Sequence, residues 1–381
     1  GPGQGVKQGV DATGNYYFAL DITDIEDPQP LWEFTEARLG ETWSTPEIGR
    51  VTVDGSDTWV AFMGSGYDNV PSQGRQGHRF YAVDIATGDY FWYFNANPEI
   101  NTRTGDPDGI IWSNTSNVLK SIPGSPAILD MDNDGDVDRV YVGDLEGRLW
   151  KVDVSPDFTD SDSWDEEVIY EDSMNYPIIT KPAVYMDTED PGAYPRIYFG
   201  TGGDDKAPAD AVFSFLALMD DPTAASQNDR VEWFLGESLL LGIPADKNVG
   251  VLSEGEKVWA DPKVANMIIY FSTLTGNIET VDPCASLSGI GRLYGRYIKA
   301  IAGAPVGGTA FRGASGNMEN LGLEIKTRAA VTLGESERAG GVRKREVYIQ
   351  EYDSTIQKLE QPVGALLKIK SWREIYKIKK D

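Results

Sequence analysis

The chain has 381 residues, of which 40% are hydrophobic and 11% aromatic, and its 41 glycines and 21 prolines indicate a globular, turn-rich protein rather than a disordered one. Its 34 basic residues against 60 acidic ones give a net charge of −26, which disfavours a nucleic-acid partner. The single cysteine and single histidine exclude a disulfide framework and a His or Cys zinc site within the chain, and no stretch is apolar enough for a membrane-spanning helix.

The beginning of the chain is Gly-rich over residues 1–10 and lacks the charged and apolar regions of a signal peptide. The first predicted strands lie at 16–21 and 31–34. They resemble the third and fourth strands of the repeats that follow, with no earlier pair before them. We therefore expect a processed or truncated chain whose first repeat is incomplete.

Four later segments open in the same way, with a proline followed two residues on by isoleucine or valine. β-branched and aromatic runs after each opening, at 59–64, 140–143, 197–200 and 268–272, predict central strands. A third run ends in aspartate, at 80–84, 149–153 and 215–220, and a fourth, aromatic run follows at 90–94 and 231–234. The openings are Pro46 and Ile48, Pro126 and Ile128, Pro182 and Val184, and Pro262 and Val264.

Four short strands per repeat are typical of a β-propeller blade, and stacked blades supply one another's buried faces. We predict an all-β fold, a modified β-propeller of four-stranded blades that is incomplete at the N-terminus. A β-sandwich is the alternative, but its strands rarely repeat in this order. Five later units are expected, the last over 327–372 with strands near Ala329, Val347, Ile356 and Leu367.

The predicted domain organisation is a single propeller over residues 1–381. Polar or Gly-rich rim insertions are expected at 154–175, 203–230 and 283–326.

Residues 130–138 are the one sharp chemical motif, with aspartate at positions 1, 3, 5, 7 and 9 and glycine at position 6. Oxygen ligands at every second residue, around a glycine that permits a sharp turn, are typical of a calcium loop. The expected ligands of one Ca²⁺ ion are the side chains of Asp130, Asp132, Asp134 and Asp138 and the backbone carbonyl of Asp136.

Position 12 of this loop is Tyr141 rather than the glutamate of an EF-hand, so the loop is predicted to join two strands of one blade. Magnesium fits less well because it keeps its waters and seldom uses an all-protein cage. An acidic turn without an ion is the remaining alternative.

Other candidate residues give weaker signals. His78 has no nucleophile elbow beside it and is interpreted as a loop histidine, and Cys284 as a small packed residue. Acidic groups elsewhere are expected to be solvated, although a carboxylate pair of the glycosidase kind is possible in principle. We therefore predict no catalytic and no cofactor-binding residue. These groups are Asp106 and Asp108; Asp187, Glu189 and Asp190; and Asp204 and Asp205.

With these features in place, the chain resembles the C-terminal β-propeller of the PilY/PilC family of type IV pilus tip adhesins and biogenesis factors. The resemblance covers nearly the whole chain, and it lies in the order of the motifs, since the individual blade motifs are shared with quinoprotein propellers. The motifs are 17–24, 30–34, 40–46, the calcium loop with 143–150, Asp282-Pro283-Cys284 and Ser371-Trp372-Arg373-Glu374.

The resemblance implies a seven-bladed propeller with one calcium site, whose ligand pattern falls on the five aspartates of residues 130–138. It also implies a non-enzymatic protein that is exported through the periplasm and located outside the cell at the pilus tip. The implied partners are minor pilins, host or abiotic surfaces, and the family's N-terminal region, which is absent here. The implied role is to promote pilus assembly and oppose retraction, with surface adhesion in some members.

Two alternatives remain open beside this interpretation. A quinoprotein-like propeller enzyme would share the blades, but many such enzymes place adjacent cysteines beside the quinone, and this chain has one. A calcium-dependent adhesin unrelated to pili, such as an integrin-type propeller, would repeat the aspartate loop in several blades.

Overall fold

The structure is a computed structural model that describes the backbone of residues 2–4, 15–67, 76–96, 120–159, 163–187, 190, 192–203, 208, 210–265, 267–275, 290–300, 305–310, 323–325, 330–337, 343–350 and 356–360. Strands dominate these residues, and their helices are single turns, α1 (Gln227–Arg230), α2 (Ser238–Leu241) and the 3-10 helix η3 (Ala245–Lys247). The predicted all-β class is confirmed.

The described strands form six sheets, which we number as blades 1 to 6 in chain order. Blade 1 contains β1 (Pro2–Gln4), β2 (Asn15–Asp21) and β3 (Gln29–Phe34). Blade 2 contains β4 (Glu47–Val53), β5 (Ser56–Gly64), β6 (Arg79–Asp84) and β7 (Tyr90–Asn95). Blade 3 contains β8 (Ala127–Leu129), β9 (Arg139–Gly143), β10 (Arg148–Asp153) and β11 (Asp165–Glu171).

Blade 4 contains β12 (Ala183–Tyr185), β13 (Arg196–Gly200), β14 (Phe215–Met219), β15 (Val231–Leu235) and β16 (Asn248–Gly250). Blade 5 contains β17 (Glu256–Val258), β18 (Lys263–Ala265), β19 (Ile268–Thr275), β20 (Ile290–Tyr297) and β21 (Leu323–Ile325). Blade 6 contains β22 (Ala330–Glu337), β23 (Arg343–Gln350) and β24 (Ile356–Glu360). Pairing within the blades is antiparallel except for β15 with β16.

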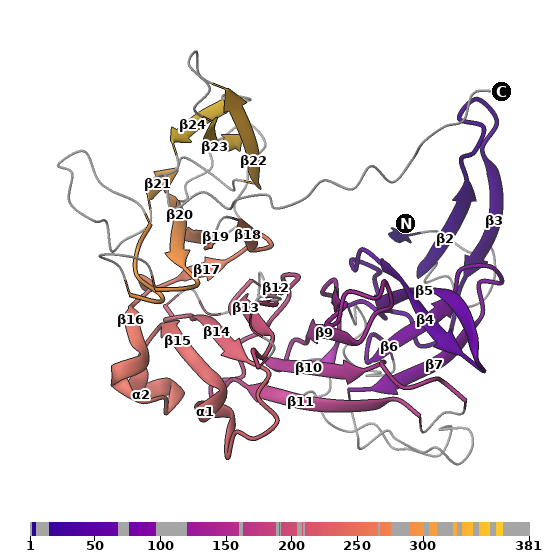
Figure 1. The fold of residues 1–381 in the computed structure, drawn as a ribbon, viewed down its shortest axis with the longest axis horizontal. Helices are drawn as coiled ribbons and strands as arrows, with labels where there is room; N and C mark the ends of the chain where they lie inside the picture. The colour runs from indigo at the N-terminus through magenta and orange to yellow at the C-terminus, as the bar shows by residue number, and fades with distance from the viewer. Residues whose placement is uncertain are drawn as a thin grey trace.

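The blades follow one another along an arc, from β2 and β3 at the right of Figure 1 to β22–β24 at the upper left. The four predicted openings all become strands, namely β4, β8, β12 and β18. The predicted central runs lie in β5, β9, β13 and β19, and the five later units correspond to blades 2 to 6. In the last unit, Leu367 lies outside the described residues.

Neighbouring blades bury their faces against each other. Blades 2 and 3 share one hydrophobic cluster, in which the ring centroids of Phe94 and Trp150 lie 4.9 Å apart. Similar clusters join blades 3 and 4, blades 4 and 5, and blades 1 and 2. Because a lone four-stranded sheet leaves both faces in water, this stacking supplies most of the core of the described blades.

Two of the three expected insertions contain strands that the sequence does not predict. Residues 154–175 include β11, and residues 283–326 include β20 and β21, whereas β14 within residues 203–230 is the run predicted at 215–220. The acidic residues of β11 conceal it in the sequence. In the structure β11 is the outer strand of its blade, and the Glu167 carboxylate lies 2.8 Å from both the Lys151 amine and the Arg230 guanidinium.

The turn between β9 and β10 explains one motif of the family resemblance. The buried carboxylate of Asp144 accepts hydrogen bonds from the Arg148 Nε (2.7 Å) and the Trp150 indole N–H (2.8 Å). The Arg148 guanidinium also lies over the Trp150 ring, 4.9 Å from its centroid. The role of this motif is therefore structural: its contacts stabilise the turn between two strands of the blade.

Candidate metal site

The aspartate loop joins β8 to β9, as predicted, at the edge of blade 3 that faces β4 of blade 2. Two residues take left-handed backbone conformations to close it, Asn133 with φ 63° and Gly135 with φ 97°. Glycine adopts this conformation without a steric penalty, which accounts for glycine at the sixth position.

Three of the five expected aspartates come together. One carboxylate oxygen from each of Asp130, Asp132 and Asp138 lies within 4.8 Å of the other two, so this triad can hold a metal ion. The side chains of Asp134 and Asp136 lie outside the triad: the Asp134 carboxylate accepts the Asp136 N–H at 2.8 Å, and the Asp136 carboxylate pairs with Arg50.

Backbone N–H groups of the loop hold the triad in place. Asp130 accepts hydrogen bonds from the N–H groups of Asn133 (2.6 Å) and Gly135 (2.8 Å). Asp138 accepts one from the N–H of Met131 at 2.6 Å, which ties the end of the loop to its beginning. The chain therefore wraps around the point at which the three carboxylates converge.

The electrostatics of the triad suit a cation. Partial burial, with the nearby carboxylates of Asp132 and Asp130, raises the pKa of Asp138 above its ordinary value. Carboxylates this close repel one another, and a divalent cation relieves that repulsion. The donors are all hard oxygens, so the residues present fit calcium or magnesium rather than a thiophilic metal.

The twelfth position of the motif confirms that the loop is not an EF-hand. Tyr141 lies in β9 with its side chain buried, and its hydroxyl donates to the Asp220 carboxylate of the next blade at 2.9 Å. It packs in the core instead of facing the loop.

Arg50 on β4 is part of this site, and sequence reasoning missed it. Its Nε pairs with the Asp136 carboxylate, and its backbone carbonyl accepts the Val137 N–H at 2.8 Å. No local signal identifies this residue, because it lies 86 positions before Asp136 and reaches the loop only when blades 2 and 3 pack together.

The other candidate residues lie apart from the triad. His78 is buried just before β6, while Cys284, Asp106, Asp108, Glu189, Asp204 and Asp205 lie outside the described residues. Asp187, which belonged to a predicted solvated group, instead pairs with Lys299.

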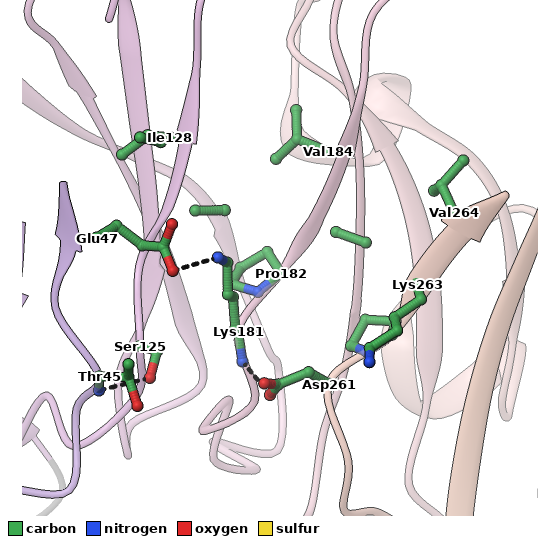
Figure 2. Close-up of a pocket in the computed structure, with 13 residues that line it drawn as sticks. Thr45, Glu47, Ser125, Ile128, Lys181, Pro182, Val184, Asp261, Lys263 and Val264 are labelled. Carbon is green, nitrogen blue, oxygen red and sulfur yellow. Dashed lines mark hydrogen bonds and ion pairs between the residues drawn. The ribbon is translucent and has the colours of Figure 1, made fainter. Parts of the chain in front are cut away.

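A pocket of about 520 Å³ lies among the opening strands of blades 2 to 5 (Figure 2). Its polar wall contains the residue that precedes each opening proline: Thr45, Ser125, Lys181 and Asp261. The Thr45 N–H donates to the Ser125 hydroxyl (2.8 Å), the Lys181 N–H donates to Asp261 (2.9 Å), and the Lys181 amine lies 2.5 Å from Glu47. These contacts join different blades, so we interpret the polar wall of the pocket as a set of structural contacts that hold neighbouring blades together.

The sequence is similar to known pilus biogenesis proteins. Residues 9–173 match the model of the PilY1 beta-propeller domain. A type IV pilus biogenesis factor PilY1 homolog from Xylella fastidiosa is 32% identical over 213 residues, which are 51% of this chain and 13% of that protein. PilY1 of Pseudomonas aeruginosa strain PAO1 is 30% identical over 146 residues, which are 38% of this chain and 10% of that protein.

The fold comparison agrees with the sequence matches. The crystal structure of the Pseudomonas aeruginosa PilY1 C-terminal domain superposes with a TM-score of 0.60 at 18% identity, over 91% of this chain and 79% of that one. This likeness confirms the predicted propeller architecture. Together, the match over residues 9–173 and the shared fold make this chain similar to the PilY1 beta-propeller domain.

Proposed function

We propose that this chain is the calcium-binding propeller module of a type IV pilus biogenesis factor, acting outside the cell at the pilus tip, and that it is not an enzyme. The observation that carries the calcium proposal is the convergence of Asp130, Asp132 and Asp138 at a blade boundary. The pilus context is supported by the PilY1 beta-propeller match over residues 9–173 and by the names of the similar proteins.

One Ca²⁺ ion is proposed, held by the side chains of Asp130, Asp132, Asp134 and Asp138 and by the Asp136 carbonyl. The Asp134 carboxylate lies outside the triad and has to move toward it to reach the ion, so binding includes a small rearrangement of the loop. Calcium accepts six to eight oxygen ligands in flexible geometry, which suits a loop of this kind better than the strict octahedron of magnesium. The ion stabilises the folded state because it binds the folded loop.

The wider role follows the family. The module is proposed to lie within one propeller domain over residues 1–381, to be exported through the periplasm, and to contact minor pilins at the tip. There it promotes pilus assembly and opposes retraction, and it is further proposed to attach to host or abiotic surfaces. Among the described residues, no helix is long and apolar enough to cross a membrane.

The test combines metal binding with partner recovery. The chain, immobilised, is incubated with proteins from sheared surface filaments, in calcium and in chelator, and the bound proteins are identified by mass spectrometry. The test variant is Asp130→Asn with Asp132→Asn. The control is Asp89→Asn with Asp246→Asn, which changes the charge equally at two exposed positions outside the loop.

The expected result is recovery of minor pilins by the wild-type chain and the control in calcium, and loss of recovery in chelator or with the loop variant. Equal recovery in all samples would reduce the ion to a structural role within the blade. Absence of pilins from every sample would overturn the pilus proposal, and quinone absorbance in the purified protein would favour the enzyme alternative.

A further inference from the structure

Arg50 contacts the metal loop from the neighbouring blade through both its side chain and its backbone. Its Nε pairs with the Asp136 carboxylate, and one terminal nitrogen lies 3.5 Å from the Asp134 carbonyl oxygen. Its carbonyl accepts the N–H of Val137, so the strand and the loop are also joined through their backbones.

The position next to Arg50 shows how closely β4 and the loop approach each other. A Cβ atom on Gly49 would lie 2.2 Å from the Val137 side chain, well inside contact distance. Val137 is buried, so the loop inserts this side chain against β4. The contact between the two blades therefore depends on a small residue at position 49 and on the buried Val137 side chain of the loop.

A second connection runs through the segment after β10. The Asp138 carbonyl accepts the Val154 N–H at 2.9 Å, and the Phe158 N–H a few residues later donates to the Thr52 carbonyl of β4 at 3.0 Å. Asp138 belongs to the carboxylate triad. Blade 2 thus contacts the loop directly at residues 134–137 and indirectly at its last ligand.

We propose that Arg50 is a positioning residue for the metal loop, and that it couples metal binding to the packing of blade 2 against blade 3. The inference rests on the proposed calcium function. Arg50 occupies the Asp136 carboxylate, which keeps that side chain away from the triad and orients the backbone through which Asp136 is proposed to bind. Residues that orient metal ligands typically change metal affinity about 10- to 100-fold when they are mutated.

The sign of the effect separates positioning from simple electrostatics. A guanidinium beside the loop repels a cation, so its removal alone should strengthen calcium binding. If Arg50 positions the loop, its removal should weaken binding despite the more negative site. Because coupling is reciprocal, calcium should also strengthen the contact between the two blades.

The experiment measures calcium binding by isothermal titration calorimetry with the full chain, using wild type, Arg50→Gln, Arg50→Lys, Asp136→Asn and the Arg50→Gln, Asp136→Asn double variant. Arg230→Gln is the matched control, since it removes an arginine that pairs with Glu167 at the boundary of blades 3 and 4. Hydrogen exchange of the Val137 amide, with and without calcium, reports the contact with blade 2.

We expect Arg50→Gln to weaken calcium binding about 10-fold or more, with Arg50→Lys intermediate, and to abolish calcium protection of the Val137 amide. The loss of calcium-binding free energy in the double variant should be smaller than the sum of the losses in the two single variants, because both substitutions remove the same contact. Arg230→Gln should bind like wild type. Tighter or unchanged binding by Arg50→Gln would overturn the inference, whereas no binding by wild type would overturn the proposed calcium function itself.

Discussion

Asp172, at the end of β11, shows how a single buried carboxylate can make the fold sensitive to pH. The residue is fully buried, and its carboxylate accepts hydrogen bonds from the N–H groups of Met174 (2.9 Å) and Tyr176 (3.1 Å). Burial outweighs these hydrogen bonds and raises the pKa of Asp172 above its ordinary value. The folded state therefore holds a proton on this group more readily than the unfolded state does.

A pH-dependent contribution to stability follows. It is fully present below the unfolded pKa, about 4, and is lost as the pH rises through the higher folded pKa. Asp172→Asn removes the titration, so the free energy of unfolding of wild type minus that of the variant should fall between pH 4 and pH 7. Urea unfolding across this range measures it, with the exposed Asp89→Asn as control. A pH-independent difference would contradict the prediction.

Glycine is needed at position 49 because β4 and the metal loop approach each other closely there, and not because of its backbone conformation, since its φ is not in the left-handed region. Gly49→Ala places a methyl group 2.2 Å from the Val137 side chain and should lower the free energy of unfolding by about 1–3 kcal/mol. Gly192→Ala is the control, because the nearest atom to its new methyl group would be 3.6 Å away. Thermal unfolding of both variants should show a loss for Gly49→Ala alone, and equal melting temperatures would refute the close contact.

At the scale of single elements, Trp164 marks the beginning of β11 and joins blade 3 to blade 2. The side chain is 2% exposed, and its ring packs edge-on against Phe158 (5.1 Å between centroids), Phe91 (5.6 Å) and Trp92 (5.6 Å). Its indole N–H donates to the Pro156 carbonyl at 3.0 Å. One side chain thus fixes both the strand and the segment that precedes it.

Trp164→Ala should therefore destabilise the protein by about 3–5 kcal/mol, the usual cost of truncating a large buried aromatic residue. Trp59→Ala is the matched control: Trp59 lies in β5 with 57% of its surface exposed, and its loss should cost far less. Guanidinium unfolding followed by circular dichroism measures both. Equal costs for the two variants would show that the cluster between blades 2 and 3 does not stabilise the fold as its burial suggests.

The elements show where sequence reasoning succeeds and where it stops. Strands with a buried, β-branched face, such as β5 and β9, are visible because their hydrophobic pattern is local. The strand β11 is not visible in this way, since it is rich in acidic residues, of which Glu167 pairs with Lys151 of the same blade and Arg230 of the next. In β20, glycines at 291 and 295 weaken the strand signal, although the strand pairs with β19 along eight residues.

The site divides in the same way. The spacing of aspartate and glycine in residues 130–138 encodes the loop, because the ligands and the turn are neighbours in the sequence. Which of the five aspartates converge also depends on the folded chain. The Asp136 carboxylate pairs with Arg50 of blade 2, while the carboxylates of Asp130, Asp132 and Asp138 lie together. The Arg50 contact forms only when the two blades pack, so no spacing within the loop predicts it.

At the scale of the whole molecule, the blades contact mainly their neighbours, as repeats do in other stacked architectures. In such proteins, stability is approximately a sum of terms for each unit and for each interface between units. A ligand that binds one unit should then protect that unit most and the units beside it less. The metal loop belongs to blade 3, whose strands β9 and β10 pack against blade 2 on one side and blade 4 on the other.

We therefore expect calcium to slow amide hydrogen exchange most in β9, less in β4 and β13, and least in β19 of blade 5. At a calcium concentration of 100 times the dissociation constant, the gain in blade 3 is at most about 2.7 kcal/mol. Hydrogen exchange followed by mass spectrometry gives the profile, and the Asp130→Asn, Asp132→Asn variant provides the baseline without bound metal. Equal protection in every blade would instead mean that the described blades unfold as one cooperative unit, so that the ion acts on the whole propeller rather than on one boundary within it.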